Sequence, residues 1–367
     1  MGETNEDSWW VFLIDSLKDM GGHIIIIFLL IILMAFVSKK KGLIVSCIGL
    51  LWLFSLRTDE IKDTVNYITM YEDPLSRLDF SEIGYLMIGM WFKTLTNADF
   101  IVFYLTVVAF CLVMWYFITQ KFLEKEAYFG FCFLLFICFN GFLYLGVVTR
   151  NALSEILLLI GVWFYIKSDS RKSRWGFIAF IVLGALIHRS AAVFLLLMPI
   201  IKLKLSDKTR LNFYFICVFI WLVVGAVVSQ YVINLFQRID YFSKLENFSI
   251  YEEKSPSLFS LQILSNVILS FMAIYVKPFI RAQYKYIYTC FLNINMAGFF
   301  VLVLLRPIPA SYRFYNMFFF FNYILLYLMI FENSKIKTVS GRKIMALVVS
   351  LAYFAILIHS FDFLLLY

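Results

Sequence analysis

Arginine side chains stand at the edges of the apolar segments of this sequence. Arg150 lies between two apolar runs and Arg189 interrupts a third; the other arginines in such positions are Arg57, Arg306 and Arg313. A guanidinium group stays charged and forms paired hydrogen bonds to phosphate or carboxylate. We therefore expect these side chains to bind a phosphate or diphosphate group. The alternative is that they only anchor helix ends in the polar interface of a membrane.

Three side chains are candidates for proton transfer. His188 is the histidine that lies within an apolar region and has a cation, Arg189, beside it. Glu82 opens a further apolar segment, and Asp63 follows Arg57 closely enough to pair with it. A positioned histidine or carboxylate can accept the proton of a reacting hydroxyl group, and we rank His188 first and Glu82 second as the base. The competing interpretation is a hydrogen-bonded structural histidine and a solvated acidic loop.

No catalytic or metal-binding motif accompanies these residues. The sequence lacks a Gly-rich phosphate loop, G-x-S-x-G, H-E-x-x-H and paired metal carboxylates. Its six cysteines lie within apolar runs and form no C-x-x-C pair, which is typical of small buried residues. We therefore expect chemistry that uses no metal and no cofactor.

The elements that position these residues must be membrane helices. Of the 367 residues, 62% are hydrophobic and 15% are charged, against roughly 45–50% and about 25% in soluble domains. Mean hydropathy is +0.86. A globule of this length cannot hide so much apolar surface from water, which excludes soluble enzymes, nucleic-acid-binding proteins and disulfide scaffolds. We predict an all-α, polytopic helical membrane bundle with a single domain over residues 1–367.

Apolar runs of about 20 residues set the number of helices. They predict about 11–13 transmembrane or re-entrant helices in all. Residues 82–97 are too short and too polar to span securely, and residues 175–201 carry His188 and Arg189 at their centre. The predicted spans are 22–38, 43–56, 99–119, 127–149, 150–166, 211–237, 258–276, 286–305, 312–332 and 344–366.

The distribution of lysine and arginine indicates how the chain crosses the membrane. If 82–97 does not cross and 175–201 forms two short limbs that turn at His188, the cytoplasmic segments hold 20 of the 32 Lys and Arg residues and four acids. This agrees with the positive-inside rule, whereas a single crossing at 175–201 moves four of those cations outside. Both termini and the long loops 57–81 and 238–257 then face outward. His188 is expected to look into a cavity that opens outward.

This orientation strengthens the case for a bound anion. It places Arg150, Arg189 and Arg313 at or next to the first turn of helices that run from outside to inside. The positive end of a helix dipole is unfavourable for a cation. Free N–H groups and guanidinium groups can, however, hold an anion together at such a helix end. We therefore predict a phosphate or diphosphate headgroup at the outer leaflet.

Four segments, in this order, resemble the EpsG-like group of Wzy-type O-antigen and exopolysaccharide polymerases. They span residues 55–200. The glycine usual between the first arginine and the aspartate is absent, and Asn151 replaces a usual glutamine. The segments are Arg57 with Asp63 and Tyr67; the E-x-G-[FY] element Glu82-Ile83-Gly84-Tyr85; the R-Q-x-[LIV]-A-like element Thr149-Arg150-Asn151-Ala152-Leu153; and the His-x-Ser-Ala element in Leu186-Ile187-His188-Arg189-Ser190-Ala191.

The resemblance implies a multi-pass protein of the bacterial inner membrane, of the membrane-glycosyltransferase (GT-C-like) type, whose active site faces the periplasm or the outside. Such proteins transfer a growing glycan from undecaprenyl diphosphate to a sugar hydroxyl of an incoming lipid-linked unit. The implied partners are the undecaprenyl-diphosphate-linked oligosaccharide, the bilayer and a chain-length-regulating membrane protein, but no nucleic acid. We expect an inverting transfer, with Tyr67, Tyr85 and Tyr315 stacking against sugar faces.

Two other functions remain open at this point. A flippase for the same lipid-linked sugars needs charges at the bilayer midplane, which the predicted spans carry sparsely. A membrane acyltransferase could use His188 to modify a surface glycan. The cellular outcomes differ: loss of a polymerase leaves single-repeat glycans, loss of a flippase leaves none, and loss of an acyltransferase removes an ester without changing polymer length.

Overall fold

The all-α membrane fold that the composition predicts is confirmed. The computed structural model describes residues 20–37, 40–56, 64–74, 83–123, 128–221, 261–305 and 312–365. Within these ranges the regular structure is helical, apart from an isolated bridge between Ile280 and Asn333. Five described helices are long and apolar enough to cross a membrane: Phe100–Leu123, Thr149–Lys167, Ala282–Leu304, Phe314–Phe331 and Val339–Ile356.

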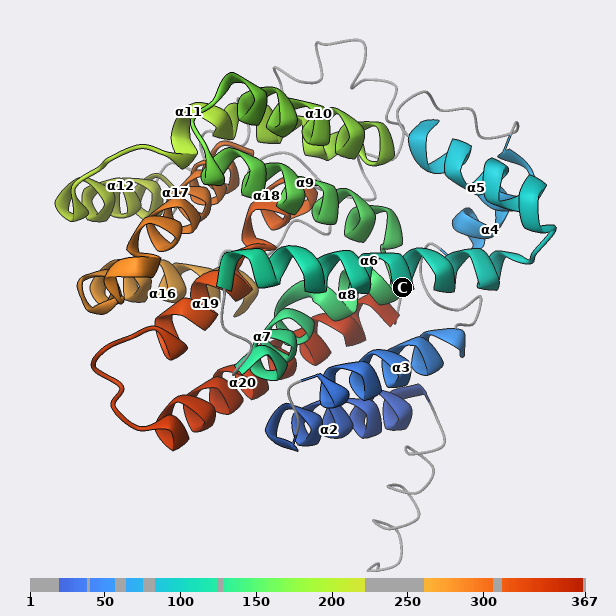
Figure 1. Ribbon diagram of the computed structural model, residues 1–367, viewed down its shortest axis with the longest axis horizontal. Helices are drawn as coiled ribbons and strands as arrows, with labels where there is room; N and C mark the ends of the chain where they lie inside the picture. Colours follow the sequence, from blue (N-terminus) through green and yellow to red (C-terminus); the bar gives the residue numbers. More distant parts are fainter. Residues whose placement is uncertain are drawn as a thin grey trace, which may run out of the picture.

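Figure 1 shows the helices as a bundle, with α4 and α5 at one end and the α11–α12 and α19–α20 connections at the other. The elements in chain order are α2 (Met20–Val37), α3 (Lys41–Ser55), α4 (Thr64–Glu72), α5 (Ile83–Thr96), α6 (Phe100–Leu123), α7 (Phe129–Phe136), the π-helix η4 (Ile137–Gly141), α8 (Phe142–Gly146), α9 (Thr149–Lys167), α10 (Arg171–Ile187), the 3₁₀-helix η5 (Arg189–Leu197), α11 (Met198–Ile201), α12 (Asp207–Phe219), α16 (Leu261–Val276), the 3₁₀-helix η7 (Lys277–Phe279), α17 (Ala282–Leu305), α18 (Tyr312–Phe319), α19 (Asn322–Phe331) and α20 (Val339–Leu365).

The chain folds back on itself at His188. Helix α10 ends at Ile187, His188 has an extended backbone (φ −147°, ψ 111°), and η5 begins at Arg189. The two limbs return to one end of the bundle, because the Lys202 ammonium group after α11 donates to the Ser168 carbonyl before α10 at 3.0 Å. Residues 168 and 202 therefore lie side by side. Whether the limbs cross the whole bilayer stays a prediction.

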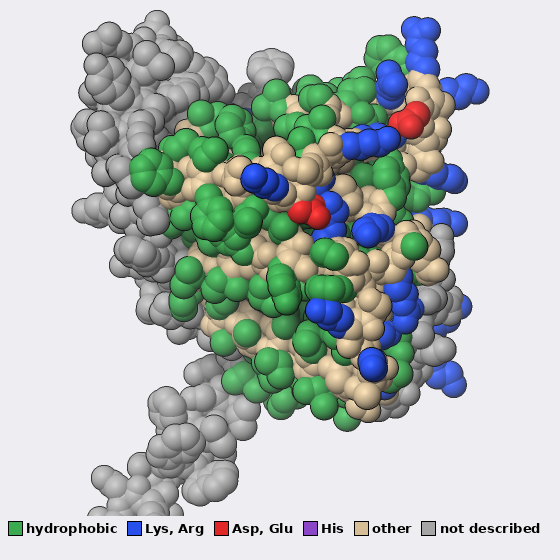
Figure 2. Space-filling view, turned by 90° about the vertical axis from the view of Figure 1, so that its left-hand side faces the viewer, with side chains coloured by type: hydrophobic (Ala, Val, Ile, Leu, Met, Phe, Trp, Pro, Cys, Tyr) green, Lys and Arg blue, Asp and Glu red, His purple; other side chains and the backbone are tan. Residues whose placement is uncertain are grey.

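Hydrogen bonds and ion pairs join four of the loops to which the charge pattern assigns a cytoplasmic location: 120–126, 202–210, 277–285 and 333–343. Figure 2, which looks at the left-hand side of Figure 1, shows a face with many Lys and Arg side chains and few acidic ones. These loops therefore share one face of the bundle. The bonds are Lys277 to Asp207, the Arg281–Glu332 pair at 3.0 Å, Ser334 N to the Phe279 carbonyl at 2.8 Å and the Tyr284 hydroxyl to the Leu123 carbonyl at 2.9 Å.

Helix α19 forms the centre of the bundle. All ten of its residues are buried, whereas α6 and α20 expose many apolar side chains at the periphery. A buried polar network crosses this centre: the Asn295 side chain accepts from the Tyr214 hydroxyl (2.6 Å) and the Ser270 hydroxyl (2.7 Å) and donates to the Asn322 amide oxygen (3.1 Å). Buried polar groups need such partners, so the network fixes how α12, α16, α17 and α19 pack together.

Gly298 allows α17 to approach α18 closely, and a methyl group there should destabilise the fold. A Cβ on Gly298 would lie 2.8 Å from the Cβ of Phe318, whereas one on Gly176 would meet Phe164 at 3.6 Å, an ordinary contact. We expect Gly298→Ala to lower the stability by about 1–3 kcal/mol through overpacking. The melting temperature in detergent measures this effect. Gly176→Ala is the control, and equal melting temperatures for the two variants would contradict the close contact.

Candidate active site

Arg150 lies in the first turn of α9 and is held by an aromatic ring. Its guanidinium carbon is 4.8 Å from the centre of the Tyr67 ring in α4, and its Nη1 lies 3.9 Å from the Met70 sulfur. The side chain is half-buried. Helix α9 begins without a side-chain cap at Val148. A permanent cation is therefore fixed by a cation–π contact at the positive end of a helix.

Aromatic side chains from three helices support this contact. Tyr67 and Tyr85 are almost fully buried, with 1% and 3% of their surface exposed, and their ring centres are 5.8 Å apart. Tyr85 packs in turn against Phe103 of α6 at 5.7 Å. The cluster joins α4, α5 and α6 beneath Arg150. In this structure both tyrosine rings contact protein side chains, so stacking on sugars remains a prediction that requires the site to open.

Gly84 brings this aromatic cluster next to the turn at His188. A Cβ on Gly84 would lie 2.8 Å from the carbonyl oxygen of Leu186 and 2.9 Å from its carbonyl carbon. Such distances leave room only for a glycine, so α5 crosses the last turn of α10 at backbone contact. Two segments of the resemblance, one with Gly84 and one with His188, are thereby placed in direct contact.

His188 is buried at this turn, with 4% of its surface exposed. Its backbone N–H donates to the Gly184 carbonyl at 2.8 Å, and its carbonyl accepts from Ala191 N at 3.0 Å. The Nε2 atom of its ring lies 3.2 Å from the Ser190 hydroxyl oxygen. The ring is therefore oriented by its own turn, as a residue that transfers protons must be.

Arg189 follows as the first residue of η5, and its side chain is exposed. It is the first of the nine residues of 3₁₀-helix that lead to α11. Runs of this length are uncommon, and such stretches often mark functional segments. Arg189 thus stands at the tip of an unusual limb, next to the buried imidazole group of His188.

The remaining predicted site residues are not brought into this cluster by the described structure. Tyr315 is buried in α18, where its ring packs against Phe319 at 5.9 Å. Arg313 is the second residue of α18, and its side chain lies outside the described part. Four further predicted residues lie outside the described ranges: Arg57, Asp63, Glu82 and Arg306.

A buried acidic residue in the same helix as Arg150, Glu155, was not among the predicted site residues. Glu155 in α9 is fully buried, and neither of its carboxylate oxygens has a hydrogen-bond partner in the described residues. Asn151 lies one turn before it on the same face of α9 and is also buried. The signal in the sequence was an acid inside an apolar span, and an ionisable residue within a membrane is a candidate functional residue by default.

A methyl group on Gly84 should separate the aromatic cluster from the His188 turn. The added Cβ meets backbone atoms of Leu186, which cannot rotate away. The resemblance predicts that cells with this protein form a glycan polymer. We expect Gly84→Ala to lower the amount of polymer by about tenfold or more, because small displacements in an active site lower the reaction rate strongly.

The control for this change is Gly89→Ala in the same helix. A Cβ on Gly89 would lie 3.5 Å from the Tyr71 ring, an ordinary contact. Protein amount in the membrane is measured in parallel by immunoblot. Equal polymer from the two variants at equal protein amount would show that the α5–α10 contact is unimportant.

Comparisons with known proteins agree with this picture at the level of the family. No curated protein matches the chain, and no solved structure matches it. One family model, the EpsG family, matches residues 40–367, a range that contains the Arg150 contact, the Gly84 crossing and the His188 turn. The family indicates a polysaccharide polymerase-like, and thus glycosyltransferase-like, role in the membrane. The chain belongs to the EpsG family.

Proposed function

We propose that this protein polymerises oligosaccharide repeat units linked to undecaprenyl diphosphate, as O-antigen or exopolysaccharide polymerases do. The observation that carries the proposal is the Arg150 guanidinium group, which is held over Tyr67 at the start of α9. Through the Tyr67–Tyr85 ring pair, Arg150 is linked to the close α5–α10 crossing, next to His188 and Arg189 in the chain. The reaction takes place at the outer face of a bacterial inner membrane.

The proposed reaction is an inverting displacement at the anomeric carbon of the growing glycan. The bond from that carbon to the phosphate oxygen breaks, and the acceptor sugar's oxygen forms the new glycosidic bond from the opposite face. The acceptor hydroxyl loses its proton to a base, and undecaprenyl diphosphate leaves with the bonding electron pair. The reaction therefore needs cations for the leaving diphosphate and a base for the acceptor.

Arginines supply the cations in this proposal. Arg150 and Arg189 bind the diphosphate, and the role extends to Arg313, Arg306 and Arg57. Fixed cations that face a developing negative charge lower a barrier because they need no reorganisation during the reaction. The contact with Tyr67 serves this purpose, since it fixes the Arg150 side chain before substrate arrives.

His188 is the proposed base, with Glu82 and Asp63 as the acidic alternatives. Its ring is buried and lies 3.2 Å from the Ser190 hydroxyl, which restricts the orientation of the imidazole group. A carbohydrate hydroxyl that reaches the ring can pass its proton to the unprotonated nitrogen. The Tyr67, Tyr85 and Tyr315 rings would bound the sugar path once the site opens.

Removal of the Arg150 guanidinium group should abolish most polymerisation. A contribution of about 2–4 kcal/mol to the transition state corresponds to a loss of about 30- to 1000-fold in rate. We expect Arg150→Ala to display single-repeat glycans on cells, and Arg150→Lys to restore little, because an ammonium group lacks the planar fork. Gel analysis of surface glycans gives the chain length.

The matched control is Arg171→Ala, which removes an exposed arginine at the first residue of α10, at the opposite end from the His188 turn. Normal chain length in both Arg150→Ala and Arg189→Ala would refute the diphosphate clamp. Complete loss of surface glycan, in place of single repeats, would favour the flippase function. Loss of a sugar ester with normal chain length would favour the acyltransferase.

Replacement of His188 should remove the base while keeping the bulk of the turn. We expect His188→Gln to slow transfer by about 10²- to 10⁴-fold and to change the pH profile of the rate, because the group that takes up the acceptor's proton is lost. Purified protein with a defined lipid-linked repeat unit gives the pH profile. An unchanged profile in His188→Gln, together with a flattened one in Glu82→Gln, would transfer the role to Glu82.

A further inference from the structure

One amide side chain makes three bonds to the inner end of the limb that carries Arg189. The Nδ2 group of Asn293 in α17 donates to the carbonyls of Ile200, Ile201 and Leu203, at 3.2, 2.9 and 3.0 Å. These carbonyls belong to the end of α11 and the connection after it, where the last carbonyls of a helix have no partner in the next helical turn; the Ile200 carbonyl also accepts from Leu203 N at 3.0 Å. Asn293 is fully buried, so this end of the limb is attached inside the bundle.

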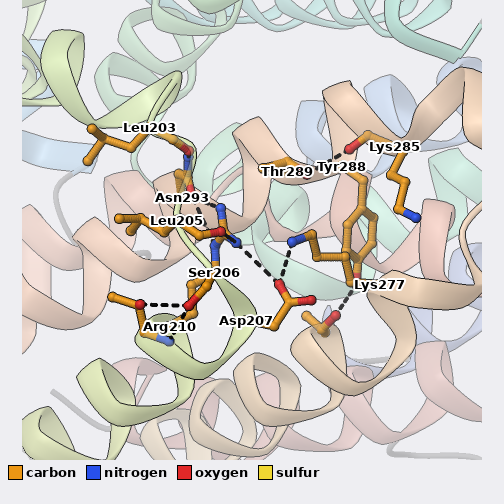
Figure 3. Close-up of polar contacts among 12 residues, drawn as sticks. Leu203, Leu205, Ser206, Asp207, Arg210, Lys277, Lys285, Tyr288, Thr289 and Asn293 are labelled. Carbon is orange, nitrogen blue, oxygen red and sulfur yellow. Dashed lines mark hydrogen bonds and ion pairs between the residues drawn. The ribbon is translucent and has the colours of Figure 1, made fainter.

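Arg210 fixes Asn293 in turn, as Figure 3 shows. Its Nε and Nη2 groups donate to the Asn293 amide oxygen at 3.2 and 3.0 Å. The Arg210 side chain is fully buried and also donates to the Asp207 carboxylate at 3.3 Å, and Asp207 binds Lys277. Hydrogen bonds from a charged donor are about twice as strong as neutral ones, so the Asn293 amide has one orientation.

The position of the inner end of the limb determines where its outer end lies. It consists of η5, nine residues of 3₁₀-helix, followed by the four residues of α11. A 3₁₀-helix rises about 2.0 Å per residue and an α-helix about 1.5 Å. Conversion of η5 to α-helix would therefore shorten the limb by about 4–5 Å. The height of His188 and Arg189 depends on an anchored inner end and on the helix type of η5.

A second hydrogen bond also holds the limb in position. The Tyr165 hydroxyl of α9 donates to the Met198 carbonyl at 2.8 Å, where η5 meets α11. Because Arg150 stands at the outer end of α9, this bond sets the limb against the helix that carries the other arginine of the site. The limb is thus held by α17 and by α9.

We propose that Asn293, backed by Arg210, is a positioning residue for the transfer reaction. It fixes the height at which His188 and Arg189 stand relative to Arg150. The inference rests on the proposed function, in which those three side chains bind diphosphate and accept the proton. Asn293 bonds to the limb and to Arg210, whereas Asn295, two residues on, bonds to the central network instead. A comparison of variants at the two asparagines therefore distinguishes an effect on positioning from an effect on stability.

The first test compares Asn293→Asp with Asn295→Asp. The aspartate at 293 keeps an acceptor for Arg210 but replaces the donor to three carbonyls with a repelling oxygen, so the limb is released. Because a shift of about 1 Å can cost about 100-fold in rate, we expect kcat to fall at least about tenfold with little change in KM. We expect Asn295→Asp to stay within about threefold of wild type at equal folded protein. Both are measured on the purified full chain with a lipid-linked repeat unit.

A milder pair covers the case in which Asn293→Asp does not fold. Tyr165→Phe removes the hydroxyl that bonds to Met198, and Tyr288→Phe removes one that bonds to the Ala273 carbonyl at 2.6 Å, away from the limb. Both lose one hydroxyl–carbonyl bond. We expect Tyr165→Phe to lower kcat by about threefold or more and Tyr288→Phe to leave it unchanged. Equal rates within both pairs would overturn the inference.

A double-mutant cycle with Arg189→Ala separates positioning from a structural effect. If Asn293 acts through the limb tip, Asn293→Asp costs much less rate in the Arg189→Ala background than in wild type, because coupled residues are not additive. Additive losses both in this cycle and in the same cycle with His188→Gln would mean that Asn293 only stabilises the fold, and would overturn the inference. Full activity in the Arg189→Ala variant alone would instead count against the proposed diphosphate clamp. If Arg189→Ala loses activity but Asn293→Asp keeps the wild-type rate, only the positioning role is refuted.

Discussion

The structure depends on a helix that breaks within the apolar bundle. Backbone N–H and C=O groups freed by a break in hydrocarbon must be bonded inside the protein. At His188 the turn meets this demand locally, through Gly184 and Ala191. The Ser154 hydroxyl of α9 also donates to the Gly184 carbonyl at 3.0 Å. At the inner end of the limb the carbonyl groups are bonded by Asn293, which lies on a different helix. The break at His188 is possible because the turn itself and the neighbouring helices α9 and α17 together supply these partners.

The break at His188 also places polar side chains near Arg150, a cation whose side chain is held in position before any substrate binds. Arg150 gains its position from Tyr67, 4.8 Å away, and Tyr67 is packed through Tyr85 against α6. None of these contacts requires a bound ligand. In the proposed polymerase, cations already in place stabilise the leaving diphosphate without the cost of reorganising side chains during the reaction.

Close backbone contact joins the two halves of the site. Gly84 gives α5 its approach to Leu186, and farther along its length α5 exposes large apolar side chains, Trp91 among them. A 14-residue helix is about 21 Å long, short of the roughly 30 Å hydrocarbon core. Helix α5 is therefore shorter than this core, and its Gly84 is a requirement of the contact with Leu186.

Composition by itself determined that the chain is an all-α membrane protein, because 62% hydrophobic residues cannot be hidden in a soluble globule. The sequence also marked Arg150 and His188 as unusual, since a charge or an imidazole inside apolar surroundings is costly without a purpose. Only the tertiary structure decided that Arg150 meets Met70, 80 residues away, and that Asn293 anchors the limb. The reason is physical: hydropathy reports that a segment prefers lipid or protein to water, but apolar faces look alike in sequence. Which faces meet is settled by side-chain packing and by buried hydrogen bonds between distant residues.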